Sequence, residues 1–409
     1  MLGLVLEGGG ARGAYHIGAY KALLEEDFTF NGVVGTSIGA INAALIAQGK
    51  VEKAYELWQN ISTEKLFGIP HLSWGKLIDD GIQLKEASKI LKTVKGVIQK
   101  KGLDRSKVKL LLEDVLDEKA IRESSMDFGL VTYSLTELKS LEYMKEDIPE
   151  GKIIEYILAS ANLPIFQAEK TDGKILLDGG LYDNLPVQLL ARKGYKDLVL
   201  IRTFAIGRVK KYNQDEVNAL VIEPTEDLGN IMDFRPEKGQ YLLNLGYYDV
   251  KRKFQNLKGS KYYIQPKNEE KFFVKYLIDF SAQGLKELAD ILELGDVPDL
   301  RFTFEHVIPL IADALDLPKH ATYEEILLGV AEWMAEKLEL ERFKIYTAEE
   351  LFDAIQAQSK RKKVFTKPKK LPAVLVKNEL GAKLFKDNIL HEISWFIAKT
   401  RSVSTTPSP

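Results

Sequence analysis

The sequence predicts an α/β fold: a three-layer α/β/α domain with a mostly parallel central sheet, followed by a C-terminal helical domain. Three features of the chain favour this fold. Short apolar segments alternate with helical patterns through the first 200 residues, an order typical of parallel sheets covered by helices. Glycine-rich turns join the first strands to the helices that follow. After about Lys267 the apolar spacing becomes helical throughout.

The first four elements set the alternation. Leu2–Glu7 is an apolar segment that predicts a buried strand, and Gly13–Glu26 carries its apolar residues on one helical side. Gly32–Gly35 predicts the second strand, and Ile38–Gln48 predicts a helix of small apolar residues. Further strands are predicted at Phe128–Tyr133, Ser140–Met144, Ile175–Leu177, Leu198–Arg202 and Tyr262–Gln265, and further helices at Ile153–Ser160 and Lys238–Phe254.

We expect two domains, at residues 1–265 and 266–409. Residues 51–123 are helical and polar apart from an apolar patch around Trp74, and we interpret them as an insertion that covers the active site. The second domain is predicted to hold consecutive helices with no strand between them, at Phe272–Leu292, Phe304–Leu315, Tyr323–Leu338, Ala348–Ser359 and Lys377–Lys399.

Two C-terminal features each admit two interpretations. The basic stretch Lys360–Lys370 is either a solvated linker or a site that attracts anionic lipid headgroups. The amphipathic helix Lys377–Lys399 either docks on its own domain or lies on a membrane. The tail Ser402–Pro409 is rich in Ser, Thr and Pro, and we expect it to be disordered.

Composition narrows the class of protein. The formal net charge is −2 over 409 residues, so the chain has no overall positive electrostatic potential that would attract nucleic acid. The absence of cysteine excludes disulfides and thiol catalysis, and it fits a reducing compartment. The apolar N-terminal run is too short for a signal peptide, and no run approaches the roughly 18 apolar residues of a spanning helix. We therefore expect a cytoplasmic protein that can contact a membrane peripherally.

The pentapeptide Gly35-Thr36-Ser37-Ile38-Gly39 fits the Gly-x-Ser-x-Gly nucleophile elbow. It lies between a predicted strand and a predicted helix, which is the context this motif needs. The turn would place the serine hydroxyl at a helix N-terminus, where backbone N–H groups stabilise negative charge. The alternative is a serine that only caps the helix.

A glycine-rich loop precedes the elbow, between the first strand and the first helix. It consists of Gly8, Gly9, Gly10, Ala11, Arg12 and Gly13. A dinucleotide-binding loop would need an acidic residue near the end of the second strand, where this chain has Thr36 and Ser37, and the Gly-Lys-Ser/Thr of a P-loop is also missing. We interpret the loop as an oxyanion hole made of backbone N–H groups; a structural turn is the remaining alternative.

A serine nucleophile needs a base. None of the five histidines, His16, His71, His306, His320 and His391, follows a predicted strand end or has a catalytic loop setting. Asp178, with Gly179 and Gly180 after it, ends the strand-like run Ile175–Leu177 and is the better candidate. The alternative is a plain Asp-Gly-Gly turn. No grouping of side chains has metal-ligand spacing, so we expect no metal in catalysis and no cofactor.

Taken in order, these motifs resemble the patatin-like phospholipases, lipid acyl hydrolases with a Ser–Asp dyad. In this family the glycine-rich loop comes first along the chain, the elbow second and the Asp-Gly-Gly motif third. The chain also carries Ala159–Phe166, similar to the family's Ala-Ser-x-x-x-Pro segment, and Asn184 and Pro186, similar to the residues after its Asp-Gly-Gly. The resemblance covers about residues 1–265 and does not extend into the C-terminal region.

The resemblance implies a role for each site residue. Ser37 is the nucleophile, and Asp178 takes its proton directly. The N–H groups of the glycine-rich loop, above all those of Gly9, Gly10 and Ala11, hold the oxyanion together with that of Ile38. Arg12 either orients this loop or meets a lipid phosphate. The implied substrates are membrane phospholipids, lysophospholipids or other acyl lipids, and a lipid alcohol in place of water would make the same site an acyltransferase.

Overall fold

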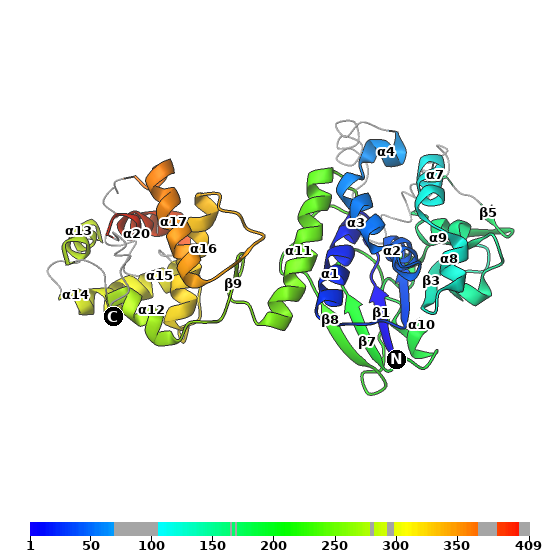
Figure 1. Ribbon diagram of the computed structural model, residues 1–409, viewed down its shortest axis with the longest axis horizontal. Helices are drawn as coiled ribbons and strands as arrows, with labels where there is room; N and C mark the ends of the chain where they lie inside the picture. The colour runs from blue at the N-terminus through cyan, green and yellow to red at the C-terminus, as the bar shows by residue number, and fades with distance from the viewer. Residues whose placement is uncertain are drawn as a thin grey trace. The chain divides into compact units, whose positions relative to one another are not determined.

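The computed structural model describes residues 1–68, 105–163, 166–167, 170–278, 282–292, 298–366 and 383–400. The chain divides into two compact units, Met1–Lys251 and Arg252–Pro409 (Figure 1). The expected patch around Trp74, the residue His71 and the tail Ser402–Pro409 lie outside the described residues. Among the described helices, none is both long and apolar enough to cross a lipid bilayer.

The first unit is built on an eight-stranded sheet with the order β5-β6-β3-β2-β1-β7-β8, and β4 pairs with β3 beside this path. Strands β1, β2, β3, β7 and β8 run parallel, whereas β4, β5 and β6 are antiparallel to their neighbours. The strands are β1 (Leu2–Leu6), β2 (Gly32–Thr36), β3 (Asp127–Ser134), β4 (Lys139–Met144), β5 (Lys170–Thr171), β6 (Lys174–Asp178), β7 (Asp197–Ile201) and β8 (Asn218–Ile222).

Helices cover both faces of this sheet, as expected. Because side chains alternate along a strand, Val34 of β2 points to the face where Leu190 of α10 packs, and the next residue, Gly35, points to α2. The helices of this unit are α1 (Ala14–Glu25), α2 (Ile38–Ala47), α3 (Val51–Asn60), α4 (Thr63–Phe67), α7 (Ser106–Val115), α8 (Glu118–Glu123), α9 (Ile153–Ser160), α10 (Val187–Ala191) and α11 (Pro236–Gln255).

Close helix packing completes the unit. Figure 1 shows α1 and α11 side by side, and a Cβ at Gly18 of α1 would lie 1.8 Å from the Leu243 carbonyl oxygen of α11. Only glycine allows that approach.

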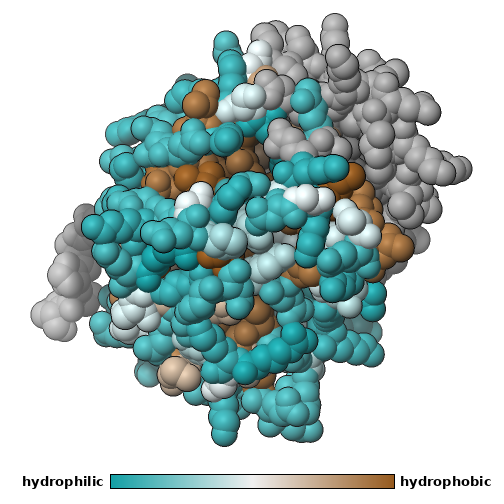
Figure 2. All heavy atoms as spheres, turned by 90° about the vertical axis from the view of Figure 1, so that its right-hand side faces the viewer, coloured by the Kyte–Doolittle hydropathy of each residue, from teal (hydrophilic) through white to brown (hydrophobic). Residues whose placement is uncertain are grey.

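On the face of the molecule that Figure 2 shows, hydrophobic side chains form separate patches between hydrophilic ones. The three-layer α/β/α fold predicted from the sequence is confirmed.

The sequence pattern missed β8 and α10. Strand β8 lies at the edge of the sheet and is only partly buried, so Asn218–Ile222 carries a weak burial signal. Helix α10 has only five residues, too few for a helical period to be recognised.

The second unit is mainly helical but differs from expectation in two respects. A short strand, β10 (Ile345–Tyr346), lies between helices where no strand was expected, and it pairs in parallel with β9 (Tyr263–Ile264). Because β9 and the neighbouring Tyr262 are buried in the core of this unit, the boundary lies between Lys251 and Arg252 and not after residue 265.

Most helices of the second unit lie at predicted positions, but two helices lie in the range predicted as one, Phe272–Leu292, and the helix Asp299–Phe302 was not predicted. The helices of this unit are α12 (Glu270–Ile278), α13 (Ala282–Leu292), α14 (Asp299–Phe302), the π-helix η4 (Thr303–Val307), α15 (Ile308–Ala314), α16 (Tyr323–Lys337), α17 (Ala348–Lys362) and α20 (Lys386–Thr400). Ile389, Leu390 and Ile393 of α20 are buried in the core of this unit. The described part of the last helix therefore docks on its own domain.

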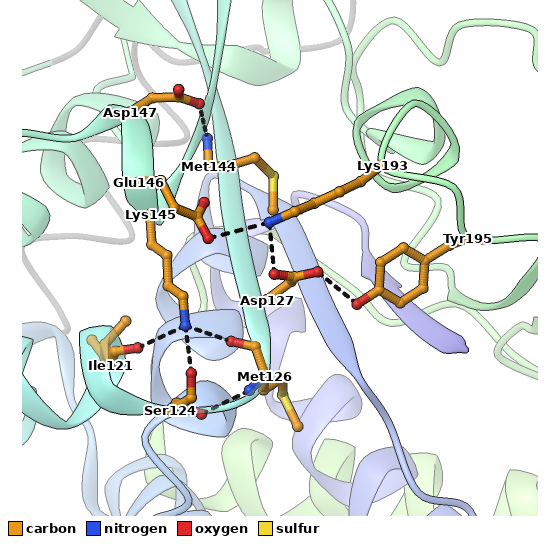
Figure 3. A network of polar contacts seen from close by, with 10 residues as sticks. All are labelled: Ile121, Ser124, Met126, Asp127, Met144, Lys145, Glu146, Asp147, Lys193 and Tyr195. Carbon is orange, nitrogen blue, oxygen red and sulfur yellow. Dashed lines mark hydrogen bonds and ion pairs between the residues drawn. The ribbon is translucent and has the colours of Figure 1, made fainter.

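A buried lysine holds the start of β3 in place (Figure 3). Lys145, only 8% exposed, lies in the short 3-10 helix η2 (Lys145–Asp147), and its Nζ donates to the carbonyls of Ile121, Ser124 and Met126 at 3.4, 2.6 and 3.0 Å. Burial lowers the pKa of this ammonium group. Beside it, Asp127 accepts from Lys193 at 2.6 Å and from Tyr195 at 2.8 Å.

Lys145→Met is expected to lower the free energy of unfolding by about 2–4 kcal/mol, because three backbone carbonyls lose a charged donor. Urea denaturation measures the loss, and hydrogen exchange of the β3 and β4 amides assigns it to the first unit. The matched control is Lys139→Met on β4, whose side chain is 61% exposed. We expect it to change the stability by less than about 0.5 kcal/mol; equal losses in the two variants would contradict the role of Lys145.

Candidate active site

Ser37 occupies a strained turn between β2 and α2. Its φ and ψ are 57° and −125°, a region that non-glycine residues rarely adopt. A Cβ at Gly35 would lie 2.3 Å from the carbonyl carbon of Gly39, so the strand and the helix can approach this closely only without side chains. The structure thus has the strand–turn–helix context predicted for the elbow.

The register of the sheet brings Ser37 and Asp178 together. Strand β4 occupies one side of β3. On the other side, β2 pairs with β3 as far as Thr36 opposite Val131, and β6 takes over with Asp178 opposite Thr132. The C-terminal ends of β2 and β6 therefore meet at adjacent residues of β3. This juxtaposition could not be inferred from the order of strands along the chain.

Asp178 is buried and has few polar neighbours. It is 3% exposed, and burial raises its pKa to about 6, against the smaller lowering effects of hydrogen bonding from Ser37 and from the Gly180 N–H. The Gly180 N–H donates to Oδ1 at 2.8 Å, whereas Oδ2 has no partner of ordinary hydrogen-bond geometry. The serine is thus close enough to affect the carboxylate through a loose contact, as catalytic pairs without substrate often are.

Buried polar residues to which we assigned no role fix the two strand ends. The Ser160 hydroxyl accepts from the Ser37 N–H at 3.0 Å and donates to the Val131 carbonyl at 2.7 Å, which ties the elbow to β3. The Asn162 carbonyl accepts from the Asp178 N–H at 2.8 Å. Both residues belong to the Ala159–Phe166 segment, whose motif was the only sequence signal for them.

Thr36 and Asn184 link the elbow to the segment after Asp178. The Thr36 hydroxyl donates to the Asp183 carbonyl at 2.8 Å, and the Gly8 N–H donates to the Asn184 carbonyl at 3.0 Å. Asn184 also lies against the glycines, since a Cβ at Gly8 would be 2.2 Å from its Oδ1. The asparagine therefore fills the space between the glycine-rich loop and the turn that Gly179 and Gly180 begin.

The glycine-rich loop differs in part from the expected oxyanion hole. The Ala11 N–H donates to the Ile231 carbonyl at 2.7 Å, and the Arg12 N–H donates to the Gly9 carbonyl at 3.2 Å. Together with the Gly8 N–H these donors are already engaged. Within the described residues, no acceptor is present for the N–H groups of Gly9, Gly10 and Ile38, which leaves those three available to an oxyanion.

Two further glycines shape this loop. Gly10 has φ of 56°, and a Cβ there would lie 2.2 Å from the Ile231 carbonyl oxygen. Gly13 ends the 3-10 helix η1 (Gly10–Gly13), and its Cβ would lie 2.5 Å from Cγ1 of Ile38. The loop and the start of α2 therefore pack in direct contact.

Arg12 stabilises the glycine-rich loop through hydrogen bonds to backbone carbonyls of neighbouring segments. Its Nε donates to the Gly229 carbonyl at 2.8 Å, and its Nη1 donates to the carbonyls of Thr203 and Phe204, each at 2.9 Å. Its ion pair with Asp227, at 3.7 Å, is secondary because that carboxylate is 85% exposed. Of the two interpretations of Arg12, the contacts favour the orienting one.

His16, the histidine nearest to the loop in sequence, is fully buried in α1, and burial lowers its pKa to about 3. Its Nδ1 lies 3.3 Å from the Asn42 amide nitrogen. A neutral imidazole with so low a pKa is a poor proton acceptor at neutral pH. Over the part of the chain that the structure describes, no group of His, Asp and Glu side chains is arranged to hold a metal ion.

Two cavities meet at Ser37. One, of about 290 Å³, is lined by Ser37 and Asp178 together with glycine-rich-loop residues, Ile206 and Arg208. The other, of about 90 Å³, begins at Ser37 and is almost wholly apolar. Its wall includes Ile41, Trp58, Phe67, Leu112, Leu158 and Phe166. The serine thus stands between a mostly apolar cavity that contains polar groups and a smaller, almost wholly apolar one.

This fold and site define an α/β protein whose serine, on a strained strand–helix turn, faces a buried aspartate. Residues 4–191 match the family model described as patatin-like phospholipase. The matched region is similar to the patatin-like phospholipase family, as the order of its motifs predicted.

Individual relatives are distant. Over 219 residues, 52% of this chain and 14% of the relative, it is 27% identical to a patatin-like phospholipase domain-containing protein of Caenorhabditis elegans. Over 330 residues, 74% of this chain and 20% of the relative, it is 26% identical to the lysophospholipase NTE1 of Kluyveromyces lactis. The chain thus spans much less than half the length of either. Among solved structures, VipD from Legionella pneumophila gives a TM-score of 0.36 at 13% identity, over 99% of this chain and 92% of VipD.

Arg12→Lys is expected to lower the free energy of unfolding by about 1–3 kcal/mol, because an ammonium group cannot reproduce the fork that reaches three carbonyls. Thermal denaturation checks the loss. Asp227→Asn, which removes only the exposed ion pair, should change the stability by less than about 0.5 kcal/mol. A larger effect of Asp227→Asn than of Arg12→Lys would contradict the brace.

Proposed function

We propose that this protein is a lipid acyl hydrolase that cleaves fatty-acyl esters of phospholipids or lysophospholipids, with Ser37 as nucleophile and Asp178 as base. The observation that carries the proposal is the buried Asp178 carboxylate, whose pKa is raised to about 6 and which Ser37 contacts. A general base is most effective when its pKa lies near the working pH. The match of residues 4–191 to a phospholipase family model and the similarity to a protein named as a lysophospholipase support a lipid acyl hydrolase in general.

In the first half of the reaction, Asp178 takes the proton of the Ser37 hydroxyl as Oγ attacks the acyl carbonyl carbon. The carbonyl oxygen becomes an oxyanion, to which the N–H groups of Gly9, Gly10 and Ile38 are available. Each such donor contributes roughly 3–4 kcal/mol of transition-state stabilisation. As the tetrahedral intermediate collapses, the alcohol leaves with the proton from Asp178, and Ser37 remains acylated.

In the second half, water gives a proton to Asp178 and attacks the acyl carbon. The Ser37–acyl bond breaks, the proton returns to Ser37 Oγ, and a fatty acid is released. No histidine takes part. A buried aspartate can act in both directions because its raised pKa makes it a stronger base than an exposed carboxylate and still a usable acid.

The two cavities offer space at Ser37 for two parts of a substrate. The apolar cavity suits a fatty-acyl chain, and the larger cavity, with Arg208 in its wall, suits the remainder of a polar lipid. The same site would serve a transacylase or a neutral acylglycerol lipase, and a non-catalytic lipid-binding module is the remaining alternative. Product analysis with and without an added lipid alcohol separates hydrolysis from transacylation.

Ser37→Ala is expected to abolish labelling by a fluorophosphonate probe and to reduce esterase activity by at least about a thousandfold, because the nucleophile is lost. Asp178→Asn should reduce turnover to a similar degree. His16→Gln serves as the control and should retain activity, since His16 is buried and not a base. Retained activity in Ser37→Ala, or its loss in His16→Gln alone, would refute the dyad.

The pH profile tests the base. Because Asp178 must be ionised to accept the proton, kcat/KM for a water-soluble ester should fall about tenfold per pH unit below about pH 6 and level off above it. Burial also raises the pKa of Asp183 to about 6, so Asp183→Asn is the control and should keep the acid limb. Loss of the limb in Asp183→Asn would assign the titration to that residue instead.

Asp178→Asn is also expected to raise the free energy of unfolding at pH 7.5 by about 2–3 kcal/mol, because burial raises the folded-state pKa of Asp178 to about 6 and the ionised form is disfavoured at this pH. The folded-state pKa lies above the ordinary value, so Asp178 stabilises the fold only at acid pH, and this contribution is lost as the pH rises through 6. The gain of the variant over the wild type should therefore disappear at about pH 4. Urea denaturation at both pH values measures it.

A further inference from the structure

Large apolar side chains are exposed around the mouth of the Ser37 cavity. Leu181 (38% exposed) and Ile206 (52%) line the cavity, and Phe204 (51%) and Val209 (37%) lie beside Ile206 on the loop after β7. We call residues 202–211 the rim loop. The other exposed large apolar side chains described in the first unit are Met1, Leu24, Leu110 and Leu138. Half of the set therefore gathers at one site, and clustering of this kind marks an interaction surface.

The backbone conformation at Phe204 keeps its side chain exposed to solvent. Its φ is 48°, in the left-handed region that a bulky aromatic residue avoids. The Glu7 carboxylate, 1% exposed, accepts from the N–H groups of Thr203 and Phe204 at 2.6 and 3.0 Å, and Arg12 donates to the carbonyls of the same two residues. Strain that is maintained by a buried clamp suggests a functional conformation.

The far end of the rim loop is fixed as well. The Arg208 N–H donates to the Gly180 carbonyl at 3.0 Å, and the Arg208 carbonyl accepts from the Asn184 N–H at 2.6 Å. The loop is thus bonded at its start beside the glycine-rich loop and near its end to the turn after Asp178. Phe204, Ile206 and Val209 are presented to solvent from a fixed backbone.

Cations accompany these apolar side chains. Arg208 and Lys211 are exposed, and neither has a carboxylate partner within the described part of the chain. Arg202 and Lys210 are neutralised by Glu7 and by Glu142 with Asp183. The rim loop contains no acidic residue. Arg208 lies over the Tyr182 ring, 5.6 Å from its centroid, and keeps its full positive charge. An apolar surface with cations that no carboxylate neutralises is complementary to an anionic lipid surface, which attracts basic residues and accepts aromatic and aliphatic side chains at the headgroup boundary.

We propose that the rim loop docks the first unit on an anionic lipid bilayer, with Phe204, Ile206 and Val209 inserted at the headgroup boundary and Arg208 and Lys211 on the headgroups. This inference rests on the proposed function in one respect: the docked membrane supplies the substrate. Docking through this loop places the mouth of the Ser37 cavity against the bilayer, so that a lipid reaches the serine without crossing bulk water.

The test measures binding of the full chain to vesicles by co-sedimentation. The vesicles contain either phosphatidylcholine alone or phosphatidylcholine mixed with phosphatidylglycerol. Phe204→Asn combined with Val209→Ser should lower the partition coefficient on the mixed vesicles about tenfold or more. Asn tolerates positive φ better than Phe, so the variant should fold at least as stably as the wild type. The matched control, Leu24→Ser with Leu138→Ser, removes two apolar side chains elsewhere that are 39% and 74% exposed and should bind like the wild type.

Arg208→Gln combined with Lys211→Gln should remove most of the preference for phosphatidylglycerol while the weaker binding to phosphatidylcholine remains. The proposal is overturned if the wild type binds neither vesicle, if the Phe204/Val209 variant binds as well as the wild type, or if the Leu24/Leu138 control loses binding equally.

A second readout separates this proposal from the proposed function. Vesicle binding is measured on Ser37→Ala as well, which should bind like the wild type. Hydrolysis of a short water-soluble ester by the wild type reports the chemistry without a membrane. Vesicle binding through the rim loop without ester hydrolysis would refute the hydrolase and leave docking supported. Ester hydrolysis without vesicle binding would do the reverse.

Discussion

The site depends on one side of strand β3 being shared by two strands. In an ordinary antiparallel pair the C-terminal ends of the strands lie at opposite edges of the sheet. Here β6 does not lie opposite β2 but continues beyond it along the same side of β3, with Thr36 opposite Val131 and Asp178 opposite Thr132. The C-terminal ends of a parallel and an antiparallel strand therefore meet. Ser160, which bonds both Ser37 and Val131, fixes this junction.

Short sequence motifs were sufficient to predict those features of the site that are formed by residues close together along the chain. The elbow, the glycine-rich loop and the Asp-Gly-Gly turn after β6 have residue types that follow from the backbone they require, so the pattern predicted where these turns lie. The pairing of Asp178 with the end of β2 is a long-range register, which no local pattern contains. Asp178 was predicted from its place at a strand end, where parallel sheets carry their sites, but β6 is antiparallel to β3. The resemblance to a family made the choice of Asp178 specific. Strands β8 and β10 and the hydrogen bond of the Ala11 N–H could be found only in the three-dimensional structure.

Several features of the site cost stability, and the surrounding structure offsets that cost. Ser37 is held at positive φ, and Asp178 is a carboxylate buried with one oxygen lacking an ordinary hydrogen bond. These features persist because Ser160 and Asn162 fix the two strand ends and Arg12 braces the loop between them. Burial that destabilises the ionised aspartate is the same burial that raises its pKa into the working range.

Glu7 and Arg12 connect the proposed chemistry to the proposed docking surface. Arg12 belongs to the glycine-rich loop that carries the available Gly9 and Gly10 N–H groups, and with Glu7 it bonds the backbone of Thr203 and Phe204. The rim loop and the glycine-rich loop are thus one hydrogen-bonded body. If the rim loop docks as proposed, the hydrogen bonds of Glu7 and Arg12 take up the force that the bilayer exerts on Phe204. Because a misplacement of about 1 Å can cost a hundredfold in rate, the docking that we propose requires a fixed backbone of this kind between Phe204 and the Gly9 and Gly10 N–H groups.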